Sequence, residues 1–191
     1  MTRIAVIVGS TRDGSFNRAL GALAATQLAA HGAEVTVVDL AALDLPIYTA
    51  ALEADAFPAD ALKLKEILAA QDGLLVVSPE YNGSIPALLK NAIDWASRPT
   101  GGEGLVALTA FRGKAAAIMG ASISPFGGVR GLAHLRQILG TIQMLVIPEQ
   151  VLVPNAHTAF DEAGQLREAL PASLVEMTAA RLVVVAKALA A

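Results

Sequence analysis

The sequence predicts an α/β fold in which a parallel sheet of five strands lies between two layers of helices. Short runs rich in β-branched residues alternate with longer segments of helical periodicity, as in sheets covered on both faces. Right-handed crossovers then favour a doubly wound, three-layer sandwich with strand order 2-1-3-4-5. The chain has 191 residues and contains no long linker or repeat, so we expect a single domain over residues 1–191.

The expected strands are short and apolar, and helices follow them in alternation. The strands cover residues 3–8, 34–38, 73–78, 115–119 and 144–147. The helices cover residues 15–31, 59–71, 85–97 and 129–140, and a last helix spans about 166–189. The helix at 85–97 has the clearest pattern, because its apolar residues recur at the i, i+3, i+4, i+7 spacing of one buried face. Ser84 is its expected N-cap, and Pro86 falls in the first turn, where a missing N–H costs little.

The composition excludes several classes of function. The chain has no cysteine, which excludes disulfides, thiolate catalysis and iron–sulfur ligation and fits a cytoplasmic protein. The net charge of −3 argues against a nucleic-acid partner, and no run of lysine and arginine indicates a membrane-surface site. Although 54% of the residues are hydrophobic, we expect no apolar run to reach the ~20 residues of a membrane-crossing helix.

The loop after the first expected strand carries the strongest functional signal. A loop between a strand and a helix directs backbone N–H groups at a ligand above the strand, and phosphate suits those groups best. A helix N-terminus alone contributes about 0.3–1 kcal/mol towards an anion, whereas each charge-assisted hydrogen bond adds roughly 1.5–3 kcal/mol. The side chains of this loop are rich in donors, namely Ser10, Thr11, Arg12, Ser15 and Asn17. We therefore expect a site for a terminal phosphate monoester, as in FMN.

Other interpretations fit this loop less well. A P-loop requires a lysine after its second glycine, but Ser15 and Phe16 follow Gly14. A dinucleotide fingerprint requires glycine where Thr11 stands, although Asp39 lies where a ribose-binding acid would be expected. A capped turn without any ligand, with Ser15 as the helix N-cap, also stays open.

Two more loops are expected at the same edge of the sheet, because ligands of open α/β sheets bind beyond the carboxyl ends of the strands. The loop after the third strand combines a rigid proline with Tyr81 and the turn-forming pair Asn82-Gly83. The loop at 120–128 places Phe126 among small residues. Only 4% of the chain is aromatic, so Tyr81 and Phe126 at one edge indicate a site for a flat heterocycle. Either loop alone would be an ordinary surface turn.

Together these motifs resemble those of a known family. The sequence resembles the NADPH-dependent FMN reductases of flavodoxin-like fold, whose members include chromate, quinone and azo-dye reductases. The resemblance lies in the runs Gly9-Ser10-x-Arg12-x-x-Ser15-x-Asn17, Pro79-Glu80-Tyr81-Asn82-x-Ser84 and Leu89-Lys90-Asn91-Ala92-Ile93-Asp94-Trp95. It covers almost the whole chain and assigns Asp39 to a structural strand exit. Residues 101–112 match no fixed motif of the family.

The resemblance implies which residues surround FMN. The phosphate would be held by Ser10, Arg12, Ser15, Phe16 and Asn17. The isoalloxazine and ribityl would lie along Pro79, Glu80, Tyr81 and Asn82, and the other side would be bordered by Ser122, Gly127 and Gly128. Backbone N–H groups of the turn formed by Tyr81, Asn82, Gly83 and Ser84 would contact flavin N5 or O4. Glu80 is expected to be a ribityl or structural partner rather than a general base.

The resemblance also implies the reaction. NADPH or NADH would pass hydride to flavin N5, and a quinone, azo compound, chromate or similar acceptor would then take the electrons. Neither a catalytic protein side chain nor a metal is expected, and members of the family assemble as homodimers or homotetramers. A flavodoxin-type electron carrier and a non-catalytic flavin-binding protein stay open as alternatives. A serine hydrolase with Ser122, Glu149 and His157 is the weakest alternative, because Ser124 replaces the second glycine of its motif.

Overall fold

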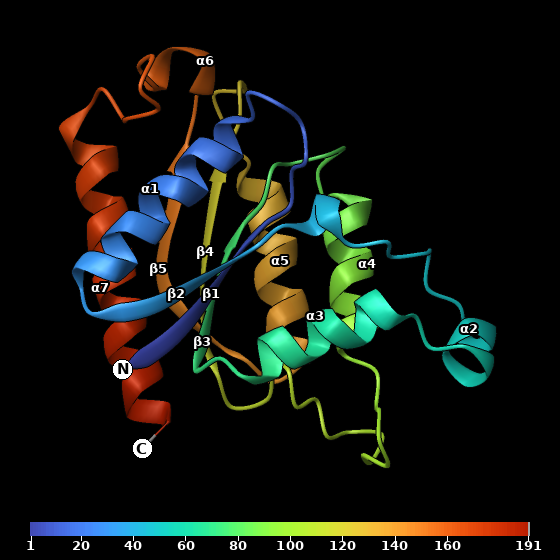
Figure 1. Cartoon of the computed structure of the whole chain (residues 1–191). Helices are drawn as coiled ribbons and strands as arrows, with labels where there is room; N and C mark the ends of the chain where they lie inside the picture. The colour runs from blue at the N-terminus through green and yellow to red at the C-terminus, as the bar shows by residue number, and fades with distance from the viewer. Residues whose placement is uncertain (191) are drawn as a thin grey trace.

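The strands form one parallel sheet with the order β2-β1-β3-β4-β5, and helices cover both of its faces (Figure 1). The computed structural model describes residues 1–190. The strands are β1 (Thr2–Val8), β2 (Ala33–Val38), β3 (Gly73–Val77), β4 (Ala115–Ala121) and β5 (Leu145–Val153). Helices α1 (Phe16–Ala30) and α7 (Ala169–Leu189) cover one face, and α3 (Ala59–Ala69), α4 (Ala87–Ala96) and α5 (Val129–Thr141) cover the other. The predicted fold class and strand order are confirmed.

Each face of the sheet has its own apolar core, and β3 contributes to both. Leu75 and Val77 pack with α1 and α7, whereas Leu74 and Val76 pack with α3, α4 and α5. Successive side chains of a strand point to opposite faces, so a strand buried on both sides needs an unbroken apolar sequence. This explains why β3 and β4, which are buried throughout, appear in the sequence as continuous apolar runs rather than as alternating patterns.

Strand β5 is longer than the predicted segment 144–147, which stopped before Pro148. The ladder with β4 pairs Ala116 with Val146 and then Ile118 with Gln150, so a bulge on β5 absorbs the intervening residues. Proline cannot donate to a ladder, but β5 lies at the edge of the sheet and pairs only with β4. The strand therefore continues beyond the proline.

The long connections contain short helices that the sequence analysis did not predict. These are the 3₁₀ turn η1 (Leu40–Ala42), α2 (Ala50–Asp55) and α6 (Ala156–Ala159). Helix α4 begins at Ala87 with Pro86 as its N-cap, so the expectation that Ser84 caps this helix is wrong. Ser84 instead belongs to the preceding turn, and Pro86 separates that turn from the helix by its fixed φ and its missing N–H.

Helix α7 corrects the expectation that no segment is long and apolar enough to cross a membrane. It has 21 residues, and its most apolar window has a mean hydropathy of 1.6, so it meets the criterion by length and composition. In the structure α7 lies along the sheet beside α1 (Figure 1). Its buried side includes Val175, Ala179, Leu182 and Ala186. Covering one face of the sheet accounts for the apolar residues of this buried side, whereas Leu170, Met177 and Val184 are exposed.

Candidate cofactor-binding site

Three loops meet at the carboxyl edge of the sheet, as the sequence predicts. They are residues 9–17 after β1, 78–84 after β3 and 120–128 after β4, and these strands are neighbours in the sheet. The start of each of the first two loops is fixed by one backbone bond: the Gly9 N–H donates to Val77 O (2.8 Å) and the Ser78 N–H to Met119 O (2.9 Å). The strand order reverses at this point, which is where open α/β sheets bind ligands.

The first loop presents a run of unused backbone donors. From Ser10 to Asn17, no backbone N–H donates a hydrogen bond to any atom of residues 1–190. Ser15 is the N-cap of α1, and its Oγ accepts only from the N–H of Arg18 (3.4 Å). Gly14 adopts a φ of 64°, which turns the loop into the helix. Consecutive free N–H groups ahead of a helix form the backbone arrangement that binds anions.

Some side chains of this loop are free to bind a ligand, and others are engaged in contacts within the protein. Arg12 is exposed, and its only hydrogen bond within residues 1–190 is from Nη1 to the carbonyl of Asp13 (3.3 Å). Ser10 and Ser15 are buried at the base of the loop. Phe16 stacks on Phe160, with ring centroids 5.9 Å apart, and packs against the core beneath α1 and α7. The Phe16 ring is therefore engaged in packing, and its backbone N–H is the group available to a ligand. Arg12 has further guanidinium donors available to a ligand.

Asn17 connects the first loop to the end of β4. Its Nδ2 donates to the carbonyl of Ala121 (2.8 Å), and its Oδ1 accepts from the N–H of Ala121 (2.9 Å). The side chain is buried and its amide is satisfied by a backbone 104 residues away. The role of this side chain in the structure is to hold two loops of the site together.

The second loop ends in a two-residue hairpin turn. The Tyr81 N–H donates to Ser84 O (2.8 Å) and the Ser84 N–H to Tyr81 O (3.0 Å). Asn82 and Gly83 have φ values of 52° and 78°, the pattern of a type I′ turn, for which Asn-Gly is the preferred pair. The predicted turn is confirmed. Its N–H groups at Tyr81 and Ser84 are used within the turn, so only those of Asn82 and Gly83 can serve a ligand.

Glu80 does not point into the site. Its Oε2 accepts from the backbone N–H groups of Arg130 (3.0 Å) and Gly131 (3.1 Å) at the start of α5. Its Oε1 accepts from Arg130 Nε (2.7 Å) and pairs with Arg130 Nη2. Burial opposes ionisation, but the Gly131 N–H and the Arg130 side chain outweigh it and lower the pKa of Glu80. A carboxylate with these partners is a structural group rather than a general base.

The third loop is built on glycines with left-handed backbone. Gly127 and Gly128 have φ values of 62° and 86°, and Gly128 is the N-cap of α5. A methyl group on Gly127 would come within 3.2 Å of the backbone nitrogen of Pro154. Ser122 Oγ accepts from the Ser124 N–H (3.1 Å), and within residues 1–190 it forms no hydrogen bond with His157. The geometry therefore does not support a hydrolase triad.

Sequence analysis missed one residue next to the site. His134, on the exposed side of α5, has its Nδ1 3.1 Å from Ser84 Oγ. The histidine is exposed, and sequence analysis did not predict its contact with the turn. The available signal was its spacing: His134 follows Arg130 by four residues, so both lie on one helix face.

A large hollow lies elsewhere in the molecule. It has a volume of about 730 Å³ and is formed by α3 and residues 99–109. These residues belong to the connection between α4 and β4, at the amino-terminal edge of the sheet (Figure 1). A smaller hollow of about 340 Å³ borders the first loop at Ser10 and Thr11 and includes Asp39. Asp39 accepts from the Ala41 N–H (3.0 Å), the structural strand exit that the resemblance implied.

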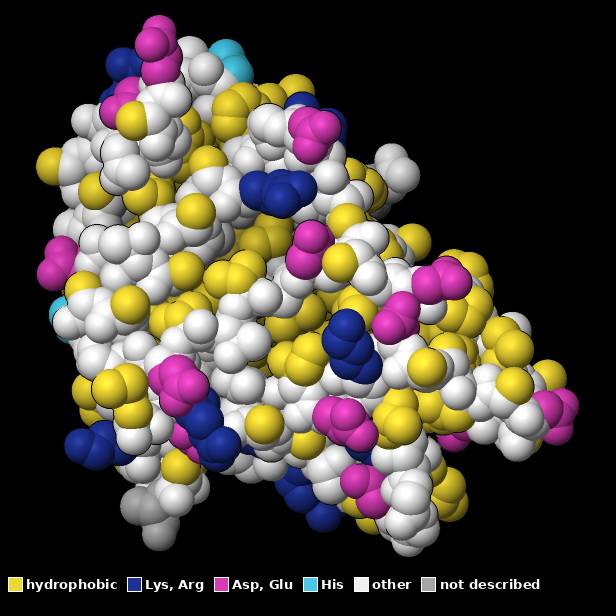
Figure 2. Space-filling model, in the orientation of Figure 1, with side chains coloured by type: hydrophobic (Ala, Val, Ile, Leu, Met, Phe, Trp, Pro, Cys, Tyr) yellow, Lys and Arg dark blue, Asp and Glu magenta, His cyan; other side chains and the backbone are white. Residues whose placement is uncertain are grey.

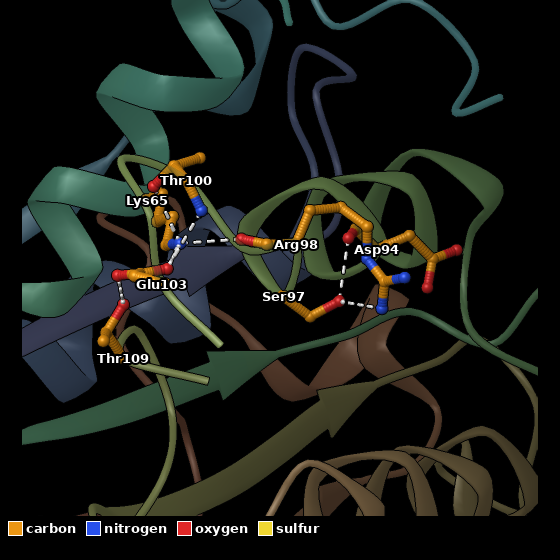
Figure 3. Close-up of polar contacts among 7 residues, drawn as sticks. All are labelled: Lys65, Asp94, Ser97, Arg98, Thr100, Glu103 and Thr109. Atoms are coloured by element: carbon orange, nitrogen blue, oxygen red, sulfur yellow. Dashed lines mark hydrogen bonds and ion pairs between the residues drawn. The ribbon is translucent and has the colours of Figure 1, made fainter. Parts of the chain in front are cut away.

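Buried polar groups hold the segment beside the large hollow in place (Figure 3). Lys65 Nζ donates to Arg98 O (2.6 Å) and Thr100 Oγ1 (2.9 Å) and pairs with Glu103. Glu103 also accepts from the Thr100 N–H (3.1 Å) and Thr109 Oγ1 (2.8 Å). Burial opposes ionisation of Glu103, but Lys65 and Thr109 lower its pKa. The side chains of Lys65, Glu103 and Thr109 thus bind groups within this segment rather than pointing free into the large hollow.

The family model of NADPH-dependent FMN reductases matches residues 2–158. The chain belongs to the NADPH-dependent FMN reductase family. A 2-hydroxy-1,4-benzoquinone reductase of a Burkholderia species is 38% identical to this FMN reductase over 165 residues, 86% of this chain and 85% of the relative. An NAD(P)H-dependent FMN reductase of Pseudomonas aeruginosa is 37% identical over 171 residues, 89% of this chain and 87% of the relative.

Solved structures agree with this assignment. The flavoenzyme NAD(P)H:(acceptor) oxidoreductase FerB of Paracoccus denitrificans has a TM-score of 0.83 and 29% identity to this FMN reductase, with 98% of each chain covered. A flavodoxin from Pseudomonas aeruginosa has a TM-score of 0.60 at 18% identity over 97% of this chain and 99% of its own, which shows a shared fold alone. The predicted family, enzyme class and cofactor are confirmed: the chain is an NAD(P)H-dependent FMN oxidoreductase.

The residues of the carboxyl edge fit FMN. The free N–H groups from Ser10 to Asn17 and the guanidinium of Arg12 form a cradle for a dianionic phosphate. The free N–H groups of Asn82 and Gly83 offer further donors on the second loop. FMN has a phosphate at one end and a planar ring with acceptors at the other, so both ends of the cofactor find suitable partners.

Proposed function

We propose that this FMN reductase transfers electrons from NADPH or NADH to a quinone or a similar small electrophile at the carboxyl edge of the sheet. The observation that carries the proposal is the run of free backbone N–H groups from Ser10 to Asn17 beside the exposed Arg12. Several relatives are quinone reductases, at 35% identity for one from Pseudomonas putida and 37% for one from Escherichia coli. FMN supplies the two-electron redox chemistry when it is bound.

In this proposal the three loops have distinct binding tasks. The phosphate is held by the backbone of the first loop with Ser10, Arg12 and Ser15, while Phe16 and Asn17 contribute backbone N–H groups from the first turn of α1. The ribityl and ring lie along the second loop, from Pro79 to Ser84. Ser122, Gly127 and Gly128 border the ring from the third loop.

The proposed acceptor is planar and apolar because of the side chains at the rim. Tyr81 is 54% exposed and Phe126 is 65% exposed, and both belong to loops of the site. Glu80 is committed to α5, so no carboxylate from the second loop is available for acid–base catalysis. A reaction whose chemistry is carried by the cofactor requires only binding, orientation and exclusion of water from these residues.

We also propose that the enzyme works in the cytoplasm as a homodimer or homotetramer. The lack of cysteine supports the location, and exposed apolar side chains such as Leu105 and Val106 support self-association. Lysine and arginine side chains are interspersed with acidic ones over the face shown in Figure 2. With a net charge of −3, this distribution supports small-molecule partners rather than nucleic acid or a membrane surface.

The decisive experiment measures FMN binding and turnover with the purified protein. We expect the visible spectrum of added FMN to change on binding, and steady oxidation of NADPH or NADH in the presence of menadione. A flavodoxin-type carrier would bind FMN but turn over negligibly alone. Protein that takes up no FMN and oxidises neither nicotinamide would contradict the proposal.

A further inference from the structure

Side-chain contacts join the second loop to α5 on both sides of its turn. Before the turn, the Glu80 carboxylate accepts from the N–H groups of Arg130 and Gly131 and pairs with the Arg130 guanidinium. After the turn, Ser84 Oγ contacts His134 Nδ1 (3.1 Å). Helix α5 starts directly after Gly128, the last residue of the third loop. The contacts therefore couple the two loops that border the ring of the proposed flavin.

The fit between the turn and α5 is close as well as polar. A methyl group on Gly131 would lie 3.2 Å from the carbonyl oxygen of Ser84 and 3.3 Å from Cβ of Glu80. Both distances are shorter than ordinary carbon contacts, so any side chain at residue 131 would push the turn away from the helix. Glycine in the interior of a helix is normally unfavourable, and here it allows the backbone of the second loop to approach.

The Glu80 carboxylate keeps the turn at 81–84 close to α5. It is 8% exposed, and it satisfies two of the backbone N–H groups that every helix leaves without intrahelical partners at its start. Negative charge is favourable at a helix N-terminus, and hydrogen bonds to an ionised group are stronger than neutral ones. Removing the carboxylate would leave both N–H groups and the Arg130 guanidinium without their partner, so the turn would lose its anchor.

We propose that Glu80 is a positioning residue for the flavin ring. Through α5, its carboxylate fixes the spacing between the turn at 81–84 and the loop at 122–128, whereas the phosphate is held independently by the first loop. This inference rests on the proposed function, since it assigns the ring to the space between these loops. The two ends of the cofactor are then bound by independent contacts. Glu80 contributes to the affinity for the ring, and Arg12 contributes to the affinity for the phosphate.

Binding of FMN and of riboflavin, which has the same ring without the phosphate, tests this separation. We expect Glu80→Ala to raise the Kd of both ligands by the same factor, about tenfold or more. Arg12→Ala should raise the Kd of FMN and leave that of riboflavin unchanged. Glu80→Gln keeps an oxygen that can accept from both backbone N–H groups, so it should restore both affinities to within about threefold of wild type. The matched control is Asp94→Ala, which removes a carboxylate from the exposed pair with Lys90 on α4.

A second variant keeps the inference testable if Glu80→Ala fails to fold. Gly131→Ala leaves the carboxylate intact, and its gain in helix propensity offsets part of the cost of the close contact, so the apoprotein should still fold. The displaced turn should nevertheless weaken FMN and riboflavin binding by equal factors and alter the visible circular dichroism of bound FMN. Wild-type affinities in both Glu80→Ala and Gly131→Ala, or a loss confined to FMN, would overturn the positioning role. If the wild-type protein itself binds no FMN, the proposed function fails first and the inference fails with it.

Discussion

At the amino-terminal edge of the sheet, the Lys65 ammonium is buried and has three partners (Figure 3). At the carboxyl edge, the backbone N–H groups from Ser10 to Asn17 donate to nothing within residues 1–190. The first edge has the larger hollow, about 730 Å³. The second has consecutive backbone N–H groups without an acceptor in residues 1–190, placed directly ahead of a helix. Because that arrangement binds anions, we locate the site from the free N–H groups and not from the volume.

The largest test of this comparison is Lys65→Met, which should damage stability and spare cofactor binding. The change leaves Glu103 in a partly buried position without its counter-charge, and we expect the free energy of unfolding to fall by about 3–5 kcal/mol in urea titrations. The pKa of Glu103 is lowered in the folded state, so this stabilisation is present above the ordinary carboxyl pKa and is lost as the pH falls through the folded value.

Two controls make the Lys65 experiment specific. Lys90→Met breaks the exposed pair with Asp94 and should cost no more than about 1 kcal/mol. The Kd of FMN should stay within about threefold of wild type in both variants, because neither residue lies at the carboxyl edge. A large loss of FMN affinity in Lys65→Met would show that the two edges are coupled.

Asn17→Ala tests a contact at the carboxyl edge that is buried and hydrogen-bonded within the protein, as the contacts of Lys65 are at the amino-terminal edge. The variant leaves the N–H and the carbonyl of Ala121 buried without partners, and we expect a loss of about 3 kcal/mol in the free energy of unfolding. Asn17→Asp should not restore stability, because a carboxylate cannot donate to the Ala121 carbonyl. Wild-type stability of the Ala variant would mean that the two loops are held by other contacts.

Arg12→Ala should affect binding and leave stability unchanged. Arg12 is exposed, so the free energy of unfolding of the apoprotein should change by less than about 0.5 kcal/mol. FMN binding should weaken by about 2 kcal/mol, roughly thirtyfold, because a hydrogen-bonded charge is lost at the phosphate. Arg18→Ala is the matched control, since Arg18 is also exposed but lies within α1 beside the smaller hollow. Equal losses in the two variants would argue for a general effect of positive charge.

The smallest expected effect concerns Lys114, which donates to the carbonyl groups of Leu68 (2.7 Å) and Ala69 (2.9 Å). Burial lowers the pKa of Lys114 to about 8, so the unfolded chain binds more protons than the folded one between that value and the ordinary 10.5. Wild-type stability should therefore rise with pH over this interval relative to Lys114→Met, by on the order of 1 kcal/mol because the side chain is only partly buried. A difference that stays constant with pH would exclude the shift.

The sequence predicted the fold because its signals are local. Apolar strands, the apolar stripe of α4 and the turn pair Asn82-Gly83 each depend on neighbouring residues. The predicted strand ended too early because a proline usually ends a strand ladder. Pro148 is tolerated in β5 because this strand lies at the edge of the sheet.

The side chains of the site were predicted less completely, since their partners are distant in the sequence. Asn17 and Glu80 were both placed at the cofactor, and their positions in the loops are as expected. Their side chains, however, bind backbone that is 104 and 50 residues away. No local pattern encodes such a contact, and the contact of His134 with Ser84 was missed for the same reason.

The bulge at Pro148 also has a consequence for the behaviour of the protein at high concentration. An outer strand exposes a row of peptide groups that a neighbouring molecule can extend into an intermolecular sheet, the first step of fibril growth. Proline removes one donor from that row, and the register shift breaks its regular spacing. The enzyme thus carries protection against aggregation in the same strand that completes its sheet.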